Sequence, residues 1–284
     1  MQTLYRNISD QLTDIYGREE ARTIAIMLLK DLFPDENDCE LLLGHREEPS
    51  GYILSLVERL RKDEPIQYVL GKTEFFGMEV HVESGVLIPR PETEELIRQI
   101  MLRFESGGGP TAVLDVGTGS GCIALAMKKC FPQARVEAWD VSDDALRIAG
   151  RNAECLGLPI IYNKVDVLNN DELRLADYDL IVSNPPYVLE EERMAMERNV
   201  LDYEPETALF VPDDDPLLFY DRIADVAVGS LTEGGLLAFE INRRFGHDIV
   251  EMLRGKGFSN VELVKDQFEN DRFVFGSWKG RRKQ

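Results

Sequence analysis

The chain has 284 residues, of which 44% are hydrophobic and 30% are charged, a composition typical of a globular protein with a sizeable core. Its formal net charge of -20 repels phosphate backbones, so no stable nucleic-acid binding is expected. Four cysteines without a CxxC pair and only three histidines argue against a zinc cluster and predict no metal, while the lack of a long apolar run predicts no membrane span and a cytoplasmic location.

The first part of the chain, residues 1–72, is expected to form a small helical domain. Apolar residues recur at helical spacing over 8–16, 24–32 and 52–60, with proline and glycine between these stretches. Residues 73–90 differ, because β-branched and aromatic side chains flank a glycine there. This pattern predicts a β-hairpin that links the helical domain to the rest of the chain.

The remaining residues, 91–284, alternate between strand and helix patterns. The expected strands are 112–115, 136–140, 160–165, 178–183 and 236–241, and the expected helices are 94–104, 120–130, 143–156, 216–231 and 246–255. Two last strands, near 259–265 and 271–277, are expected to pair antiparallel. Alternation of this kind predicts an α/β fold with a doubly wound, mostly parallel seven-stranded sheet and helices on both faces.

A glycine-rich loop follows the first of these strands. The glycines fall as GxGxG at Gly117, Gly119 and Gly121, and Asp115 precedes them. A dinucleotide fingerprint would instead read GxGxxG. A carboxylate at the strand end suits a cationic ligand better than a pyrophosphate, and S-adenosyl-L-methionine carries both an ammonium and a sulfonium group. A nicotinamide-dependent dehydrogenase remains the alternative for this loop.

Two further acids follow the next two strands. Asp140 ends the second strand, about 20 residues past the glycines, where a carboxylate can accept both ribose hydroxyls. Asp166 follows the third strand, where an adenine edge would lie. The competing interpretation is that Asp115 and Asp140 only cap helices, but three acids at successive strand ends favour a nucleoside site.

The tetrapeptide Asn184-Pro185-Pro186-Tyr187 follows the fourth strand. Two prolines fix two φ angles and remove two N–H donors, so the segment is stiff and its carbonyls can accept. Asn184 offers a carbonyl acceptor and an NH2 donor, and Tyr187 offers a flat face. Together they match a planar –C–NH2 group, unless the segment is only a rigid turn.

Such a site fits methyl transfer to an amide nitrogen. The lone pair of an amide nitrogen is delocalised into the carbonyl, so the nitrogen is a poor nucleophile. Acceptors that hold its hydrogens localise electron density on it, and alignment with the methyl donor can lower the barrier by about 7–11 kcal/mol. No strong general base is needed beforehand, because the alkylated nitrogen becomes acidic and loses its proton afterwards.

The loop 115–121 and the tetrapeptide 184–187 resemble those of amino methyltransferases that act on adenine, cytosine or glutamine nitrogens. Further segments resemble one branch of that group, the peptide chain release factor glutamine methyltransferases of the HemK/PrmC family. They are Phe75-Phe76-Gly77, Leu87 to Glu94, Glu204-Pro205 with Ala208-Leu209, and Asp271-Arg272. The resemblance covers nearly the whole chain, including the helical domain.

The resemblance implies methyl transfer from S-adenosyl-L-methionine to the side-chain N5 of the glutamine in the Gly-Gly-Gln motif of class 1 peptide chain release factors. The product of the donor would be S-adenosyl-L-homocysteine. The helical domain would serve substrate recognition as one wall of the groove for the protein substrate. Two rivals stay open: a ribosomal-protein glutamine methyltransferase, which shares the tetrapeptide, and a nucleic-acid adenine-N6 methyltransferase, which would need a basic groove.

The resemblance also assigns roles by motif position. The residues that would contact the cofactor are Gly117, Thr118, Gly119, Ser120, Gly121, Asp140 and Asn184. The strand-end acids Asp115 and Asp166 and the neighbouring Val167, which falls where some members carry an aromatic residue beside the adenine, complete that expected set. The glutamine would be held by Asn184, Pro185, Pro186 and Tyr187, and the expected catalytic residues are Asn184, Pro185 and Tyr187.

Overall fold

A computed structural model describes residues 3–44, 49–105, 107–169 and 177–280. The chain divides into two compact units. Unit 1 comprises residues 1–72 and 197–203, and unit 2 comprises residues 73–196 and 204–284. The short return of 197–203 to unit 1 has no counterpart in the sequence pattern.

Unit 1 is helical, as the apolar spacing predicted. Its helices are α1 (Leu4–Leu32), α2 (Asp38–Leu43), α3 (Gly51–Leu60), α4 (Ile66–Leu70) and α8 (Arg198–Tyr203). Buried side chains of α1 and α3, such as Leu12, Leu28 and Leu60, form its core. Gly17 interrupts α1 with a φ of 73°, a conformation that glycine adopts without a steric penalty. The hydroxyl of Tyr203 donates to the carbonyl of Lys62 at 2.8 Å and ties α8 to this unit.

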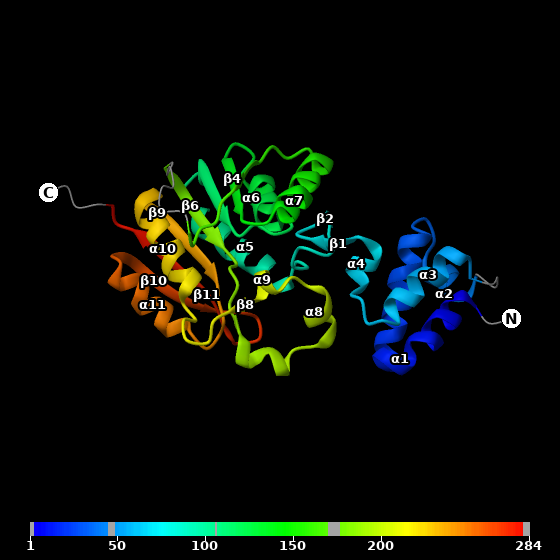
Figure 1. Cartoon of the computed structure of the whole chain (residues 1–284). Helices are drawn as coiled ribbons and strands as arrows, with labels where there is room; N and C mark the ends of the chain where they lie inside the picture. The colour runs from blue at the N-terminus through cyan, green and yellow to red at the C-terminus, as the bar shows by residue number, and fades with distance from the viewer. Residues whose placement is uncertain (1–2, 45–48, 106, 170–176, 281–284) are drawn as a thin grey trace. The chain divides into compact units, whose positions relative to one another are not determined.

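Unit 2 contains the sheet and the helices that cover it (Figure 1). Its strands are β1 (Lys72–Phe75, which begins at the boundary), β2 (Met78–His81), β3 (Ala112–Val116), β4 (Arg135–Asp140), β5 (Ile161–Lys164), β6 (Tyr178–Ser183), β7 (Val188–Leu189), β8 (Phe210–Val211), β9 (Leu231–Glu240), β10 (Phe258–Lys265) and β11 (Asp271–Trp278). Its helices are α5 (Pro91–Phe104), α6 (Cys122–Cys130), α7 (Asp143–Leu156), η1 (Glu190–Ala195), α9 (Glu206–Leu209), α10 (Leu218–Ser230) and α11 (Gly246–Gly255).

The seven-stranded sheet has the order β10-β11-β9-β6-β3-β4-β5. The strands from β9 to β5 pair in parallel, and β11 pairs antiparallel with both β9 and β10. This confirms the doubly wound sheet with a terminal antiparallel pair. The strand order reverses between β3 and β6, so the carboxyl ends of these two strands mark the place where open α/β sheets bind ligands.

Helices cover both faces of the sheet. In Figure 1, α5, α6 and α7 lie on one face and α10 and α11 on the other. An apolar cluster joins α10 and α11 to the sheet through fully buried aromatic side chains, among them Tyr220 and Phe239. The two rings meet edge to face with centroids 5.3 Å apart, a favourable geometry for an aromatic pair. Because helices bury both faces of the sheet, the sequences of the parallel strands are continuous apolar runs.

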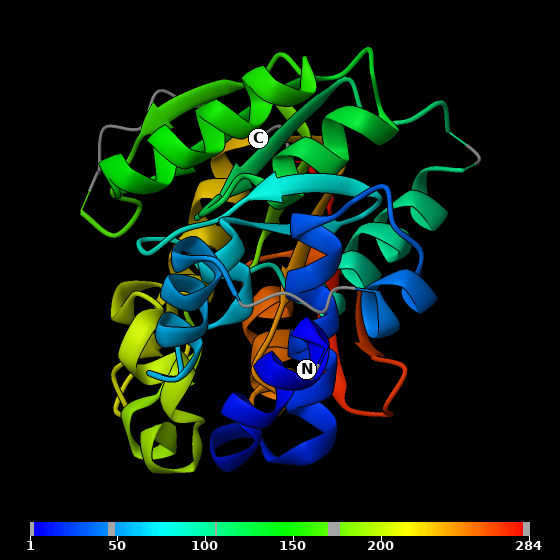
Figure 2. The same cartoon turned by 90° about the vertical axis from the view of Figure 1, so that its right-hand side faces the viewer.

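The predicted hairpin is present as the pair β1 and β2, joined by a two-residue turn at Phe76 and Gly77. Both turn residues have positive φ, 51° and 65°, as tight hairpin turns require. The hairpin lies beside α7 (Figure 2). There the buried side chain of Asn152 bonds both backbone groups of His81 and the carbonyl of Ser120, so one amide connects the hairpin to the glycine loop.

The main difference from the predicted elements lies at residues 188–211. The short elements β7, η1, α9 and β8 occupy this stretch, together with α8 of unit 1. They are too short to show a periodicity, and side-chain contacts hold them in place, such as Asn242 donating to the carbonyl of Tyr187 at 3.0 Å and to Glu192 at 2.9 Å. In the described residues, no helix has both the length and the apolar character needed to cross a membrane.

Candidate active site

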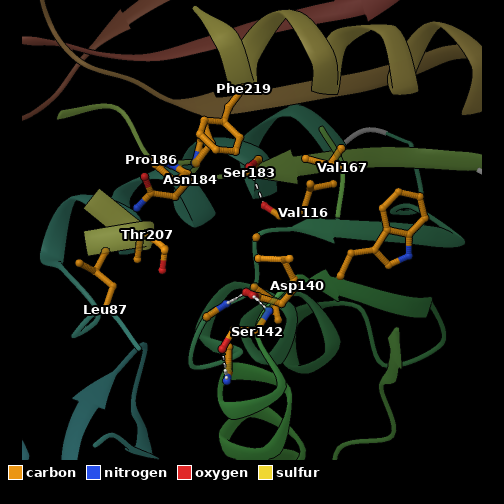
Figure 3. A pocket seen from close by; sticks show the side chains of 18 of the residues that line it. Leu87, Val116, Asp140, Ser142, Val167, Ser183, Asn184, Pro186, Thr207 and Phe219 are labelled. Carbon is orange, nitrogen blue, oxygen red and sulfur yellow. Dashed lines mark hydrogen bonds between the residues drawn. The ribbon is translucent and has the colours of Figure 1, made fainter. Parts of the chain in front are cut away.

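A cavity of about 430 Å³ opens at the carboxyl edge of the sheet in unit 2, large enough for a nucleoside-sized ligand. Residues following β3, β4, β5 and β6 line it, together with the segment before α5 and the start of α10. Figure 3 shows Asn184 and Pro186 on one side of this space, and Asp140 and Val167 on another. Parallel strands end at one edge of the sheet, so the fold brings together Val116 and Ser183, which lie 67 positions apart in the chain.

The glycine loop forms one boundary of the cavity. Gly117 and Gly119 have φ values of 74° and 54°, and a Cβ at either would meet no heavy atom within 4 Å, so their bare backbone leaves room for a ligand. Gly121 serves packing instead, since its Cβ would lie 2.9 Å from the Cβ of Ala149 on α7. Thr118 and Ser120 also line the cavity.

Asp115 lies behind the loop and does not line the cavity. Its side chain is fully buried, and its Oδ2 accepts from the hydroxyl of Thr118 at 2.6 Å and from the backbone N–H of Ala124 at 3.2 Å. Burial raises the pKa of Asp115 to about 7, against these two hydrogen bonds. The structure thus gives Asp115 a supporting position beneath the loop rather than the wall position expected for a direct ligand contact.

Asp140 is the last residue of β4. It lines the cavity, and each carboxylate oxygen accepts one backbone N–H, that of Gly119 at 2.9 Å and that of Ser142 at 2.9 Å. Figure 3 shows both bonds. Removal from water raises the pKa of Asp140, and the hydrogen bonds of Ser142 and Gly119 oppose that rise. The carboxylate is held rigidly, with lone pairs left for further donors.

One part of the cavity is lined by apolar side chains. Val167, Leu168, Phe219 and Ile223 line it, and Phe219 comes from the first turn of α10. Asp166 also lines the cavity, but its carboxylate accepts from the backbone N–H groups of Leu168 and Asn169 and from the Asn169 side chain. These bonds lower the pKa of Asp166, with that of the Asn169 side chain the largest cause. Its carboxylate therefore fixes the turn that carries Val167.

The tetrapeptide after β6 lies at the same edge. Ser183 fixes its start, because its hydroxyl donates to the carbonyl of Val116 at 2.6 Å. Asn184, Pro185 and Pro186 line the cavity. The Nδ2 of Asn184 donates to the hydroxyl oxygen of Thr93 at 3.3 Å, which leaves its carbonyl oxygen as the available acceptor.

Tyr187, in contrast, does not line the cavity. Its ring packs against the apolar cluster between α10, α11 and the sheet, and its hydroxyl donates to the Oε1 of Glu240 at 3.3 Å. Burial is the first cause of its raised pKa, followed by the charge of Glu240. Packing thus turns the ring of Tyr187 toward the interior and away from the wall position expected for a residue that stacks on a ligand.

The cavity has a further side, which comes from the segment before α5 and from α9. Leu87 and Thr207 lie there (Figure 3). Arg90 also lines it, and its Nη2 lies 2.5 Å from the Oε1 of the buried Glu204. Among the described lining residues, Arg90 is the only basic one. Among residues 3–44, 49–105, 107–169 and 177–280, no group of three or more His, Cys, Asp or Glu side chains is placed to hold a metal ion.

Several residues that line the cavity were not predicted from the sequence. Thr93, Thr207 and Phe219 reach the cavity only through the packing of α5, α9 and α10. Phe219 had one signal, since Pro216 starts a helix pattern directly after an acidic stretch and places an aromatic in its first turn. Thr93 lies in the family-like segment 87–94, but its place in a run of acidic residues gave no reason to assign it a role.

Comparison with solved structures identifies the fold. A methyltransferase from Pyrococcus furiosus superposes with a TM-score of 0.50 at 19% identity, covering 72% of this chain and 91% of that one. A 16S rRNA methyltransferase from T. thermophilus, solved with AdoMet and guanosine, gives a TM-score of 0.53 at 19% identity, covering 73% and 49%. The family model described as the methyltransferase small domain matches residues 96–202.

Proteins found by sequence comparison are more similar to this chain than these solved structures are. A release factor glutamine methyltransferase of Bacteroides thetaiotaomicron is 43% identical over 272 residues, which cover 94% of this chain and 96% of that protein. One from Chlorobaculum tepidum is 36% identical over 88% of this chain and 92% of that protein. The fold, with its cavity at the carboxyl edge of the sheet, is that of the Rossmann-like methyltransferase class. Within that class, the chain belongs to the release factor glutamine methyltransferase family.

Proposed function

We propose that this protein transfers a methyl group from S-adenosyl-L-methionine to the side-chain N5 of the glutamine in the Gly-Gly-Gln motif of peptide chain release factors, leaving S-adenosyl-L-homocysteine. The observation that carries the proposal is that Asn184 and Asp140 face one cavity from different sides (Figure 3). The residue that would bind the substrate amide, Asn184, and the carboxylate that would bind the ribose, Asp140, thus line the same cavity. Family membership supports glutamine as the acceptor.

The cavity residues fit the methyl donor. The two oxygens of Asp140, each already fixed by one backbone N–H, would accept the ribose hydroxyls. Val167 and Phe219 would cover the adenine, with Asp166 at its edge, and residues 117–121 would lie along the methionine part. Bound there, S-adenosyl-L-methionine supplies an activated methyl group on a sulfonium.

The residues of the tetrapeptide would prepare the nucleophile. The carbonyl oxygen of Asn184 would accept one N–H of the substrate amide, and the backbone carbonyl of Pro185 would accept the other. Two acceptors on one nitrogen raise its electron density, and the rigid Pro-Pro backbone fixes its direction. We assign Asp115 an indirect role through Thr118, and we assign Tyr187 to the support of the site.

Charge supports a protein acceptor over a nucleic acid. Asp140 and Asp166 line the cavity, and Arg90, the basic residue found there, is already paired with Glu204. The charges that line the cavity therefore do not attract the phosphates of a nucleic acid. A ribosomal-protein glutamine remains the second candidate acceptor. Because release factors act during translation, we propose that the reaction takes place in the cytoplasm.

The test is transfer of labelled methyl from the donor to a purified class 1 release factor, ribosomal proteins and duplex DNA in parallel. We expect label on the glutamine of the Gly-Gly-Gln motif, located by mass spectrometry. Asn184→Ala should lower turnover at least about 100-fold, while the dissociation constant of the donor stays within about threefold. Asn163→Ala, outside the cavity, is the matched control. Label that appears on another substrate and not on the release factor would refute the proposal.

We also propose that unit 1 recognises the protein substrate. Several of its large apolar side chains are exposed, among them Leu43 at 59% and Tyr52 at 64%, and such side chains favour protein contacts over water. Tyr52→Ala should raise the KM for the intact release factor. It should leave the KM for a short Gly-Gly-Gln peptide unchanged, and an equal change for both would contradict the assignment.

A further inference from the structure

We infer that Thr93 and Glu240 are positioning residues that set which end of the Asn184 side-chain amide faces the substrate. The inference rests on the proposed methyl transfer to an amide, and it adds two residues to which the family motifs assign no role. They come from distant parts of the chain, with Thr93 in the first turn of α5 and Glu240 at the last position of β9.

The three side chains form a short hydrogen-bond relay. The Oγ1 of Thr93 donates to the Oε2 of Glu240 at 2.7 Å. The Nδ2 of Asn184 donates to the same Oγ1 at 3.3 Å. Thr93 is 2% exposed and Glu240 is 1% exposed, so bulk water does not compete for the bond between them.

The direction of the relay follows from donor counting. A carboxylate only accepts, and a hydroxyl has one hydrogen to donate. Because Thr93 gives its hydrogen to Glu240, its oxygen can only accept from Asn184. The amide of Asn184 must therefore turn its NH2 group toward Thr93 and keep its carbonyl oxygen for the substrate. If the side-chain amide of Asn184 were reversed, its carbonyl oxygen would face the Oγ1 of Thr93. Two acceptor oxygens would then meet beside the buried carboxylate of Glu240, which is strongly unfavourable.

A second contact fixes Glu240 itself. Its other oxygen, Oε1, accepts from the hydroxyl of Tyr187 at 3.3 Å. The last residue of the tetrapeptide therefore bonds this carboxylate directly, and the first is linked to it through Thr93. Arg272 on β11 adds a positive charge that lowers the pKa of Glu240, while burial, the larger effect, raises it to about 7. The relay requires the ionised form of Glu240, so it is tested at a pH well above the pKa of Glu240.

The experiment compares Thr93→Val with Thr93→Ser at pH 8.5. Valine keeps the volume and removes the hydroxyl, whereas serine keeps the hydroxyl. We expect Thr93→Val to lower kcat for the release factor at least about tenfold relative to Thr93→Ser, because the acceptor is no longer oriented. The donor's dissociation constant should stay within about threefold in both. Equal kcat values for the two variants would overturn the inference.

A second measurement does not depend on turnover. In the unliganded protein with 15N-labelled asparagine, the side-chain amide signal of Asn184 is assigned by its loss in Asn184→Asp. We expect this signal to shift and to exchange with solvent at least about tenfold faster in Thr93→Val than in Thr93→Ser. An unchanged signal would overturn the relay. Wild-type protein that fails to methylate the release factor would instead reject the proposed function, and the amide signal would still report on the relay.

Discussion

Arg90 and Glu204 form an ion pair that connects two sides of the cavity, with Arg90 Nη2 and Glu204 Oε1 2.5 Å apart. The other oxygen of Glu204 accepts the backbone N–H of Ile88 at 3.1 Å. The side chain of Glu204 is 1% exposed and that of Arg90 is 33% exposed. One buried carboxylate therefore holds both the backbone and the side chain of the segment before α5.

Because Glu204 is more deeply buried than Arg90, substitutions of the two residues should lower the free energy of unfolding by different amounts. Arg90→Ala leaves a buried carboxylate without its cation and should cost about 3 kcal/mol of unfolding free energy. Glu204→Gln keeps an acceptor for Ile88, and the partly exposed Arg90 can turn to water, so about 1 kcal/mol is expected. Urea unfolding measures both, with Arg98→Ala as the control because its pair with Glu94 is more exposed. A loss for Arg90→Ala no larger than for Arg98→Ala would contradict the buried pair.

Asp140→Asn should weaken binding of the methyl donor about 10- to 100-fold. The new NH2 group would oppose the backbone N–H of either Gly119 or Ser142, since each now donates to one oxygen. Hydrogen bonds to a charged acceptor contribute about 1.5–3 kcal/mol each, and about 1.4 kcal/mol is a factor of ten in affinity. Calorimetry with the donor measures the change, and Asp143→Asn on the exposed side of α7 is the control. Equal affinities of wild type and Asp140→Asn would exclude a sugar contact.

The position of Asp140, Asp166 and Asn184 around one cavity was predictable because it depends on chain topology alone. Each lies at or just after the end of a strand, and parallel strands in a doubly wound sheet end at one edge. The alternation of apolar runs with helical spacing was a strong signal, since both faces of the sheet are buried.

Which way each side chain points was less predictable. Tyr187 follows the same strand end as Asn184, yet its ring turns inward to Glu240. Thr93 and Glu240 are 147 positions apart, and their contact exists only because α5 packs beside the end of β9. No spacing in one sequence encodes such a contact, because it depends on how two elements pack rather than on their periodicity.

The buried carboxyl of Asp115 predicts a pH dependence of stability. Its pKa is raised from 3.8 to about 7 in the folded chain, with burial as the first cause. Between these values the folded state binds more protons than the unfolded state, so this contribution to stability is complete below pH 3.8 and is lost as the pH rises through 7. Asp115→Asn carries no such penalty. Its urea midpoint relative to wild type should rise between pH 5 and 8 and level off above, and a constant difference over that range would contradict the raised pKa.

Gly121 and Ala149 offer a test of how the glycine loop packs on α7. In Gly121→Ala, the new Cβ would lie 2.9 Å from the Cβ of Ala149, and the backbone φ there is 85°. A left-handed conformation costs a residue with a side chain about 1–2 kcal/mol, and overpacking adds about 1–3 kcal/mol. We therefore expect a loss of about 2–5 kcal/mol in unfolding free energy.

The double variant separates these two costs. Ala149→Gly alone should cost about 1 kcal/mol, since glycine is a poor helix former. Combined with Gly121→Ala, it removes the clash but not the backbone strain, so the double variant should be more stable than the sum of the single losses by about 1–2 kcal/mol. Urea unfolding of all four proteins gives this coupling directly. Strictly additive losses would mean that the two Cβ positions do not meet, and that the loop relaxes away from α7.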